Sequence, residues 1–130
     1  MSNRKLSGLT LLVPTYDAGI GFFVDKLGFD LLENTDMGGG KRWVVVAPSK
    51  SNQTRIILAQ PSSPEQQAAT GNQTGGRVGF FLETDDFEQD HAAFSAKGVV
   101  FTETPRVEVY GKVAVFQDDF GNLWDLIQPA

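Results

Sequence analysis

The residues of this chain that could do chemistry are few, and their spacing does not complete any common motif. Asp118 to Asn122 resembles the start of a calcium-binding loop, but the glycine and the bidentate glutamate required further along are absent. Gly38 to Lys41 resembles a phosphate-binding loop, yet Thr35 replaces the leading glycine and Arg42 replaces the serine or threonine. We therefore expect a tight turn at the first segment and a hairpin turn at the second.

No pair of a nucleophile and a base can be placed from the sequence. The chain contains no cysteine, which excludes a disulfide framework, a thiolate nucleophile and a cysteine-based metal site. It also lacks the Gly-x-Ser-x-Gly elbow of serine hydrolases. The single histidine, His91, falls with Phe87 and Phe94 on one stripe of a predicted helix, so we expect a half-buried packing residue and not a ligand.

Composition narrows the classes of partner. A net charge of −5 argues against nucleic acid, whose binding depends on clustered lysine and arginine. No stretch is long enough to span a bilayer, and no apolar signal region follows the charged first residues. We expect a cytoplasmic protein without a membrane or nucleic-acid partner.

A degenerate tandem repeat supplies the elements that must position the candidate residues. Each copy reads strand, helix, strand, strand, strand, and such self-similarity indicates a repeated architecture. The matching segments are Leu9–Val13 with Val78–Leu82, Asp17–Phe29 with Phe87–Val99, Arg42–Val46 with Lys112–Phe116, and Arg55–Pro61 with Leu123–Pro129.

Both predicted helices carry start or stop signals. Thr84 to Asp86 offer side chains that can accept hydrogen bonds from the first N–H groups of the second helix. Gly28 and Gly98 stand just past the helix ends, where a left-handed residue is favoured. The first helix has an apolar stripe at spacing i, i+3, i+4 and i+7, which consists of Ile20, Phe23, Val24 and Leu27.

One long polar stretch, Pro61 to Gly76, separates the two copies. It is dense in Ser, Pro, Gln, Thr and Gly, a composition typical of a linker. We expect a first module over residues 1–62, a linker over 63–76 and a second module over 77–130, which together form one domain of 130 residues.

The chain resembles the vicinal oxygen chelate superfamily, which includes glyoxalase I, extradiol dioxygenases and bleomycin-resistance proteins. The resemblance runs from about Leu9 to Gln128, and its carriers are Phe22–Phe29, Gly76–Phe80, Tyr110–Gly111 and Asp118–Gln128. It implies an α+β fold of two βαβββ modules, whose sheets curl into an open eight-stranded barrel around a cavity. It also implies a homodimer. Because the superfamily includes several chemistries and pure binders, it does not fix a function.

Metalloenzymes of that superfamily take one metal ligand from the first strand and one from the last strand of each module. In this sequence the first-strand positions fall on Gly8 and Arg77, and the last-strand positions fall on Ile57 and Asp125. Glycine and isoleucine have no ligating group, and arginine stays cationic. Since Asp125 alone does not make a site, we predict no metal and no other cofactor.

In the resembled fold the first and last strands of a module are neighbours. Alternation along a strand then places Arg77 and Asp125 on one face, where a guanidinium and a carboxylate match in bidentate geometry. We expect this ion pair to stand in place of the metal, with a low pKa for Asp125 and Arg77 receiving an anionic group. The pair could equally serve only to neutralise two charges in the wall.

Aromatic side chains are expected to line the rest of the cavity. The candidates are Phe81, Trp43, Tyr110 and Phe116, whereas Trp124 is expected to pack under a helix. With Arg77 and Asp125 they would suit a flat, partly charged organic molecule.

Three interpretations remain open from the sequence. The first is a metal-free small-molecule binding protein that resembles bleomycin-resistance proteins, and it is favoured by the missing metal ligands. The second is an enzyme, either a glyoxalase- or dioxygenase-like metalloenzyme whose ligands are misaligned, or a metal-free catalyst with Asp125 as base. The third is a dimerising module without a small ligand.

Overall fold

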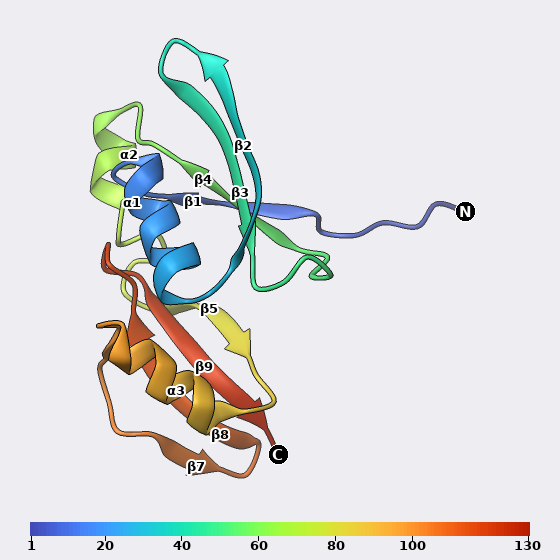
Figure 1. Cartoon of the computed structure of the whole chain (residues 1–130), viewed down its shortest axis with the longest axis vertical. Helices are drawn as coiled ribbons and strands as arrows, with labels where there is room; N and C mark the ends of the chain where they lie inside the picture. Colours follow the sequence, from blue (N-terminus) through green and yellow to red (C-terminus); the bar gives the residue numbers. More distant parts are fainter. The chain divides into compact units, whose positions relative to one another are not determined.

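The computed structural model describes all 130 residues and confirms an α+β fold built from two tandem modules (Figure 1). The chain divides into two compact units, Met1–Gln67 and Ala68–Ala130. Its strands form two separate sheets, of four and five strands, and not one closed barrel. No helix is long and apolar enough to cross a membrane.

The first unit has one sheet, in the order β1-β4-β3-β2, in which β1 and β4 are parallel and the other pairs are antiparallel. Its helical segment packs on one face through Phe22 and Phe23, both fully buried. The elements are β1 (Gly8–Leu12), α1 (Tyr16–Ile20), the π-helical η1 (Gly21–Lys26), β2 (Asp30–Gly38), β3 (Lys41–Ala47), β4 (Arg55–Ala59) and α2 (Pro64–Ala69).

The second unit repeats this plan in the order β5-β9-β8-β6, with β5 and β9 parallel. Its predicted second strand is broken into two short pieces, β6 and β7, which pair with successive parts of β8. This break raises the number of strands above the eight that we expected. The elements are β5 (Val78–Glu83), α3 (Phe87–Ala96), β6 (Val100–Phe101), β7 (Arg106–Glu108), β8 (Gly111–Gln117) and β9 (Leu123–Pro129).

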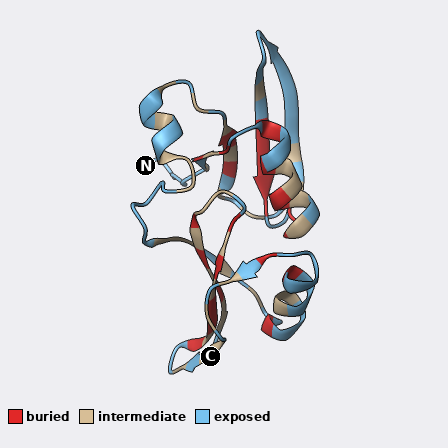
Figure 2. Ribbon diagram, turned by 90° about the vertical axis from the view of Figure 1, so that its left-hand side faces the viewer, coloured by how far each residue is buried: buried red, intermediate tan, exposed pale blue.

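Buried residues gather where each helix faces its own sheet, as Figure 2 shows. In the first unit the predicted helix is real, but its second half is π-helical. The wider turn changes which residues face the sheet, so Phe22 joins Phe23 in the core while Val24 is only half-buried. Phe23 and Leu27 of the predicted stripe are buried as expected, whereas Ile20 and Val24 are only half-buried and the stripe missed Phe22.

Each module also joins its last strand to the start of its helix. Gln60, just after β4, accepts a hydrogen bond from the backbone N–H of Tyr16 at 3.0 Å. In the second module Gln128 on β9 accepts from the backbone N–H of Phe87 at 2.8 Å. These side chains satisfy N–H groups that have no partner within the helix itself. The repeat therefore extends to equivalent contacts within each module.

The remaining signals for helix ends and turns are confirmed. Asp86 caps α3 by accepting from the N–H of Gln89, and Gly28 and Gly98 close their helices at φ of +73° and +86°. The Gly38–Gly40 segment is a hairpin turn between β2 and β3 in which all three glycines have positive φ. The polar stretch over 63–76 is not an irregular linker throughout, because it contains the short helix α2.

The acidic segment before β9 is a tight turn centred on Asp118, whose side chain is 3% exposed. Its Oδ1 accepts from three successive backbone N–H groups, those of Phe120, Gly121 and Asn122, at 2.9–3.0 Å. Its Oδ2 accepts from the side chains of Asn122 and Trp124. The carboxylate is therefore satisfied by protein donors, as the turn interpretation predicts.

We expect Asp118→Ala to lower the free energy of unfolding by about 2–4 kcal/mol, because it leaves several buried donors without an acceptor. Urea denaturation measures this change, and Asp85→Ala, which removes an exposed carboxylate from the same unit, should change stability by less than about 0.5 kcal/mol. A loss for Asp118→Ala no larger than that of the control would show that water can replace the turn's acceptor.

Candidate functional site

The two faces of the second sheet differ in character. One face is covered by α3, and on it Trp124 stacks between Phe80 and Phe116, with ring centroids 4.7 and 5.8 Å apart. Phe116 also contacts Phe94 of α3. We call the opposite face of this sheet the helix-free face. The side chains on it come from neighbouring positions of β5, β9 and β8, and they are Phe81, Glu83, Val113, Val115, Asp125 and Ile127.

Asp125 lies in the middle of the helix-free face, between Phe81 of β5 and Val115 of β8. Its Oδ1 atom is buried and has no hydrogen-bond partner. Burial raises the pKa of Asp125 above its ordinary value near 3.8, an effect opposed by the charge of Arg106 and increased by that of Glu103. The predicted low pKa was therefore wrong.

Arg106, and not Arg77, is the cation beside Asp125. Its Nε donates to both carboxylate oxygens of Glu103 at 3.1 Å, and its Nη1 donates to Glu108 at 2.9 Å. Interaction with the Tyr110 hydroxyl, and then with these two carboxylates, raises the pKa of Arg106. The guanidinium is thus fixed on β7 by two carboxylates and a phenol.

Glu103 also repairs the interruption between β6 and β7. Its Oε1 accepts a hydrogen bond from the backbone N–H of Val115 at 3.1 Å, while the Val115 carbonyl accepts from the N–H of Thr102 at 2.9 Å. A side chain thereby replaces a backbone acceptor at the point where the second strand is broken. Arg106 holds Glu103 in this role, so the charged cluster and the sheet support each other.

The predicted ion pair between Arg77 and Asp125 is absent. Arg77 is exposed and precedes β5, where the register changes between Val78 and Phe80. Because of this bulge, Val78 pairs with Leu123 and thus shares the side of Asp125, which moves Arg77 out of the alternation that we assumed. The residue opposite Asp125 is Phe81.

The other predicted site residues are divided between several places. Phe81 is 68% exposed beside Asp125, and Tyr110, 54% exposed, adjoins Arg106. Phe116 is fully buried under α3, which corrects its expected place on a cavity wall, whereas Trp124 packs under the helix as predicted. Trp43 belongs to the first unit, where its Nε1 donates to Glu33.

His91 is a packing residue, as the stripe of the second helix predicts. Its ring lies 5.6 Å from that of Phe87 and 4.1 Å from that of Phe101, between α3 and β6. It therefore lies with the core on the side of α3, away from Asp125.

The four positions that hold a metal in related enzymes do not fit one in this chain. Gly8 and Ile57 face each other so closely that a Cβ on Gly8 would lie 2.8 Å from Ile57 Cδ1. An aliphatic side chain thus fills the place of the two ligands in the first module. No group of three or more His, Cys, Asp or Glu side chains is arranged so that it could hold a metal ion. The donor set therefore lacks the oxygen and nitrogen groups that a resident metal requires.

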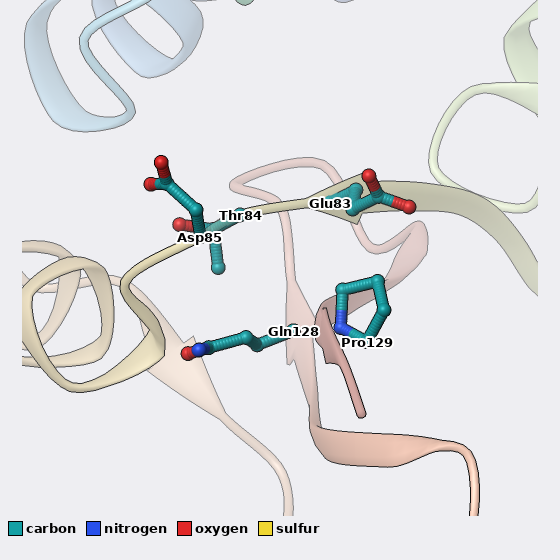
Figure 3. A pocket seen from close by; sticks show the side chains of 5 residues that line it. All are labelled: Glu83, Thr84, Asp85, Gln128 and Pro129. Atoms are coloured by element: carbon teal, nitrogen blue, oxygen red, sulfur yellow. The ribbon is translucent and has the colours of Figure 1, made fainter.

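A polar hollow lies at the C-terminal ends of β5 and β9. Figure 3 shows the side chains that line it, which are Glu83, Thr84, Asp85, Gln128 and Pro129. The two carboxylates point away from each other, and Gln128 already caps α3. The hollow therefore lacks polar groups that point toward one ligand position, and the Gln128 amide is already used to hold the start of α3.

Comparison with known proteins assigns the family. The model of the Glyoxalase/Bleomycin resistance protein/Dioxygenase superfamily matches residues 5–126. The chain belongs to this superfamily. An uncharacterized protein of Shewanella frigidimarina (strain NCIMB 400) is 50% identical to it over 126 residues, which cover 96% of this chain and 93% of the relative.

Two solved structures are similar to the chain over nearly its whole length. TnmS3, an antibiotic binding protein from Streptomyces sp. CB03234, is 30% identical with a TM-score of 0.80, and the match covers 100% of this chain and 99% of TnmS3. UcmS2, at 24% identity, has a TM-score of 0.83 and coverage of 97% and 98%, which supports the fold alone.

Sequence reasoning missed the cluster of Glu103, Arg106 and Glu108. The signal was the alternation of acid and base just before a clear strand, with Arg106 and Glu108 two residues apart and so on one side of an extended segment. The cluster was missed because the repeat predicts a second strand in this module but gives no residue range for it, since the strand is broken there.

We expect Asp125→Asn to become more stable relative to the wild type as pH rises from about 3 to 7. The folded-state pKa is raised, so the wild type loses stability as pH rises above the unfolded-state value near 3.8, while asparagine does not titrate. Thermal unfolding across pH measures the difference, and Asp85→Asn corrects for the loss of one negative charge. A difference that stays constant with pH would contradict the raised pKa.

We also expect two neighbouring variants to move the pKa of Asp125 in opposite directions. Arg106→Met should raise it further, because the guanidinium is the charge that lowers it, and Glu103→Gln should lower it. Carbon-13 NMR titration of the Asp125 carboxyl measures both. Shifts of the same sign would place the controlling charge elsewhere.

Proposed function

We propose that this chain is a metal-free binding protein for a small organic molecule, which it holds on the helix-free face without transforming it. The similarity to TnmS3, an antibiotic binding protein, supports binding as the activity. The character of the face supports its location, since an exposed aromatic ring adjoins a small number of polar groups there.

The observation that carries this proposal is the buried Oδ1 of Asp125, which lacks a hydrogen-bond donor. Leaving a buried acceptor unsatisfied costs free energy, so such a group needs an explanation beyond folding. A ligand that donates to the exposed side of this carboxylate would stabilise a charge that burial disfavours. Phe81, 68% exposed on the adjacent strand, offers an apolar surface beside it.

The proposal includes a homodimer in the cytoplasm. Exposed apolar side chains support association with a second copy, and in the second unit they include Val107 and Val109. Neither nucleic acid nor a membrane is proposed as a partner, because the chain is acidic, with a net charge of −5, and has no helix that could cross a bilayer.

A second candidate is metal-free proton transfer with Asp125 as the base. The raised pKa of Asp125 favours it, because a carboxylate with a higher pKa accepts a proton more readily than an ordinary one. Binding is preferred because no nucleophile or second acid adjoins Asp125 at hydrogen-bond distance. The glyoxalase- or dioxygenase-like metalloenzyme alternative lacks its donor set.

We expect protein purified without chelators or a histidine tag to contain far less than one metal ion per chain by plasma mass spectrometry. We also expect it to bind at least one member of a panel of planar aromatic compounds and to release it with unchanged mass. Calorimetry and chromatography with mass detection measure the two outcomes. Stoichiometric metal would favour the metalloenzyme, and a changed mass without metal would favour Asp125 as a base.

A further inference from the structure

The charges on the helix-free face are unbalanced toward the negative. Three carboxylates, those of Asp125, Glu103 and Glu108, surround one guanidinium, that of Arg106. The guanidinium is already bonded to two of them. A ligand on this face therefore meets an excess of negative charge and no unpaired cation within the cluster.

Asp125 is the member of the cluster whose charge is not paired directly. Its neighbours across the strands, Phe81 and Val115, are apolar, and neither can donate a side-chain hydrogen bond. Arg106 acts on Asp125 through its charge, without a hydrogen bond to it. The vacant acceptor Oδ1 thus lies in apolar surroundings, where an electrostatic contact is stronger than in water.

We propose that the ligand of the helix-free face is a flat aromatic molecule bearing a cationic N–H group, which donates to the partly exposed carboxylate of Asp125 while its ring lies on Phe81. This inference rests on the proposed binding function and names its ligand class. It reverses the expectation of an anionic group received by arginine. A cation balances the excess negative charge and offers the Asp125 carboxylate a charged donor, whereas an anion would be repelled by carboxylates on the same face.

The test compares two probes that share one ring system and differ in charge. At pH 7, 9-aminoacridine is a flat aromatic cation with N–H donors, and acridine-9-carboxylate is the corresponding anion. Isothermal titration calorimetry with the full-length wild type should show binding of the cation at least about tenfold tighter than the anion. Asp125→Asn, which keeps the size of the side chain, should remove most of that preference.

Asp85→Asn is the matched control, since it removes one exposed carboxylate from the same unit and should retain the preference. Far-ultraviolet circular dichroism and thermal unfolding should establish that both variants are folded. A preference unchanged in Asp125→Asn, or lost equally in the control, would overturn the role of Asp125 in selection.

The remaining outcomes separate this inference from the binding function on which it rests. Equal or tighter binding of acridine-9-carboxylate by the wild type would overturn the cationic class while leaving small-molecule binding in place. Binding of neither acridine would overturn the aromatic cation as ligand. Only a failure of the whole planar panel as well would count against the binding function.

Discussion

The parallel pairing of the first and last strands within each module is the constraint on which the rest of the structure depends. A parallel pair needs a crossover, and in both modules this connection begins with the helix, which covers one face of the sheet, and continues through the intervening strands. The other face is then left without a helix. In the second module this pairing places Asp125 beside Phe81, so the same constraint that buries the aromatic core also defines the candidate site.

Local sequence signals were sufficient to predict the helices and strands. Predicting which side chains meet at the site requires the register between strands that are far apart in the sequence. The tandem repeat, the glycines at the helix ends and the burial of Trp124 followed from spacing and composition. The predicted ion pair between Arg77 and Asp125 was wrong, because one bulge between Val78 and Phe80 reverses which face of the sheet the preceding residues occupy. Phe116 is the cross-strand partner of Trp124 and shares its buried face, but that pairing is visible only in the structure.

The charged cluster shows how a break in secondary structure can become part of a site. Where the second strand of the second module is interrupted, Glu103 takes over a backbone hydrogen bond, and Arg106 fixes Glu103. The first module has an uninterrupted β2 and a filled aliphatic space at Gly8 and Ile57. The two copies thus keep one architecture, while the broken strand and its charged cluster belong to the second copy. Such a local departure from regular structure is expected where a site is built.

The glutamine contacts set the earliest point during synthesis at which the helix of each module can gain its last N-terminal hydrogen bond. The backbone N–H groups of Tyr16 and Phe87 donate to glutamine side chains that lie 44 and 41 residues further along the chain. A helix emerging from the ribosome therefore stays incompletely capped until the final strand of its own module has been made. Folding of the first copy can finish once Gln60 has left the ribosome, before β5 has emerged, so a duplicated sequence need not exchange strands between its copies.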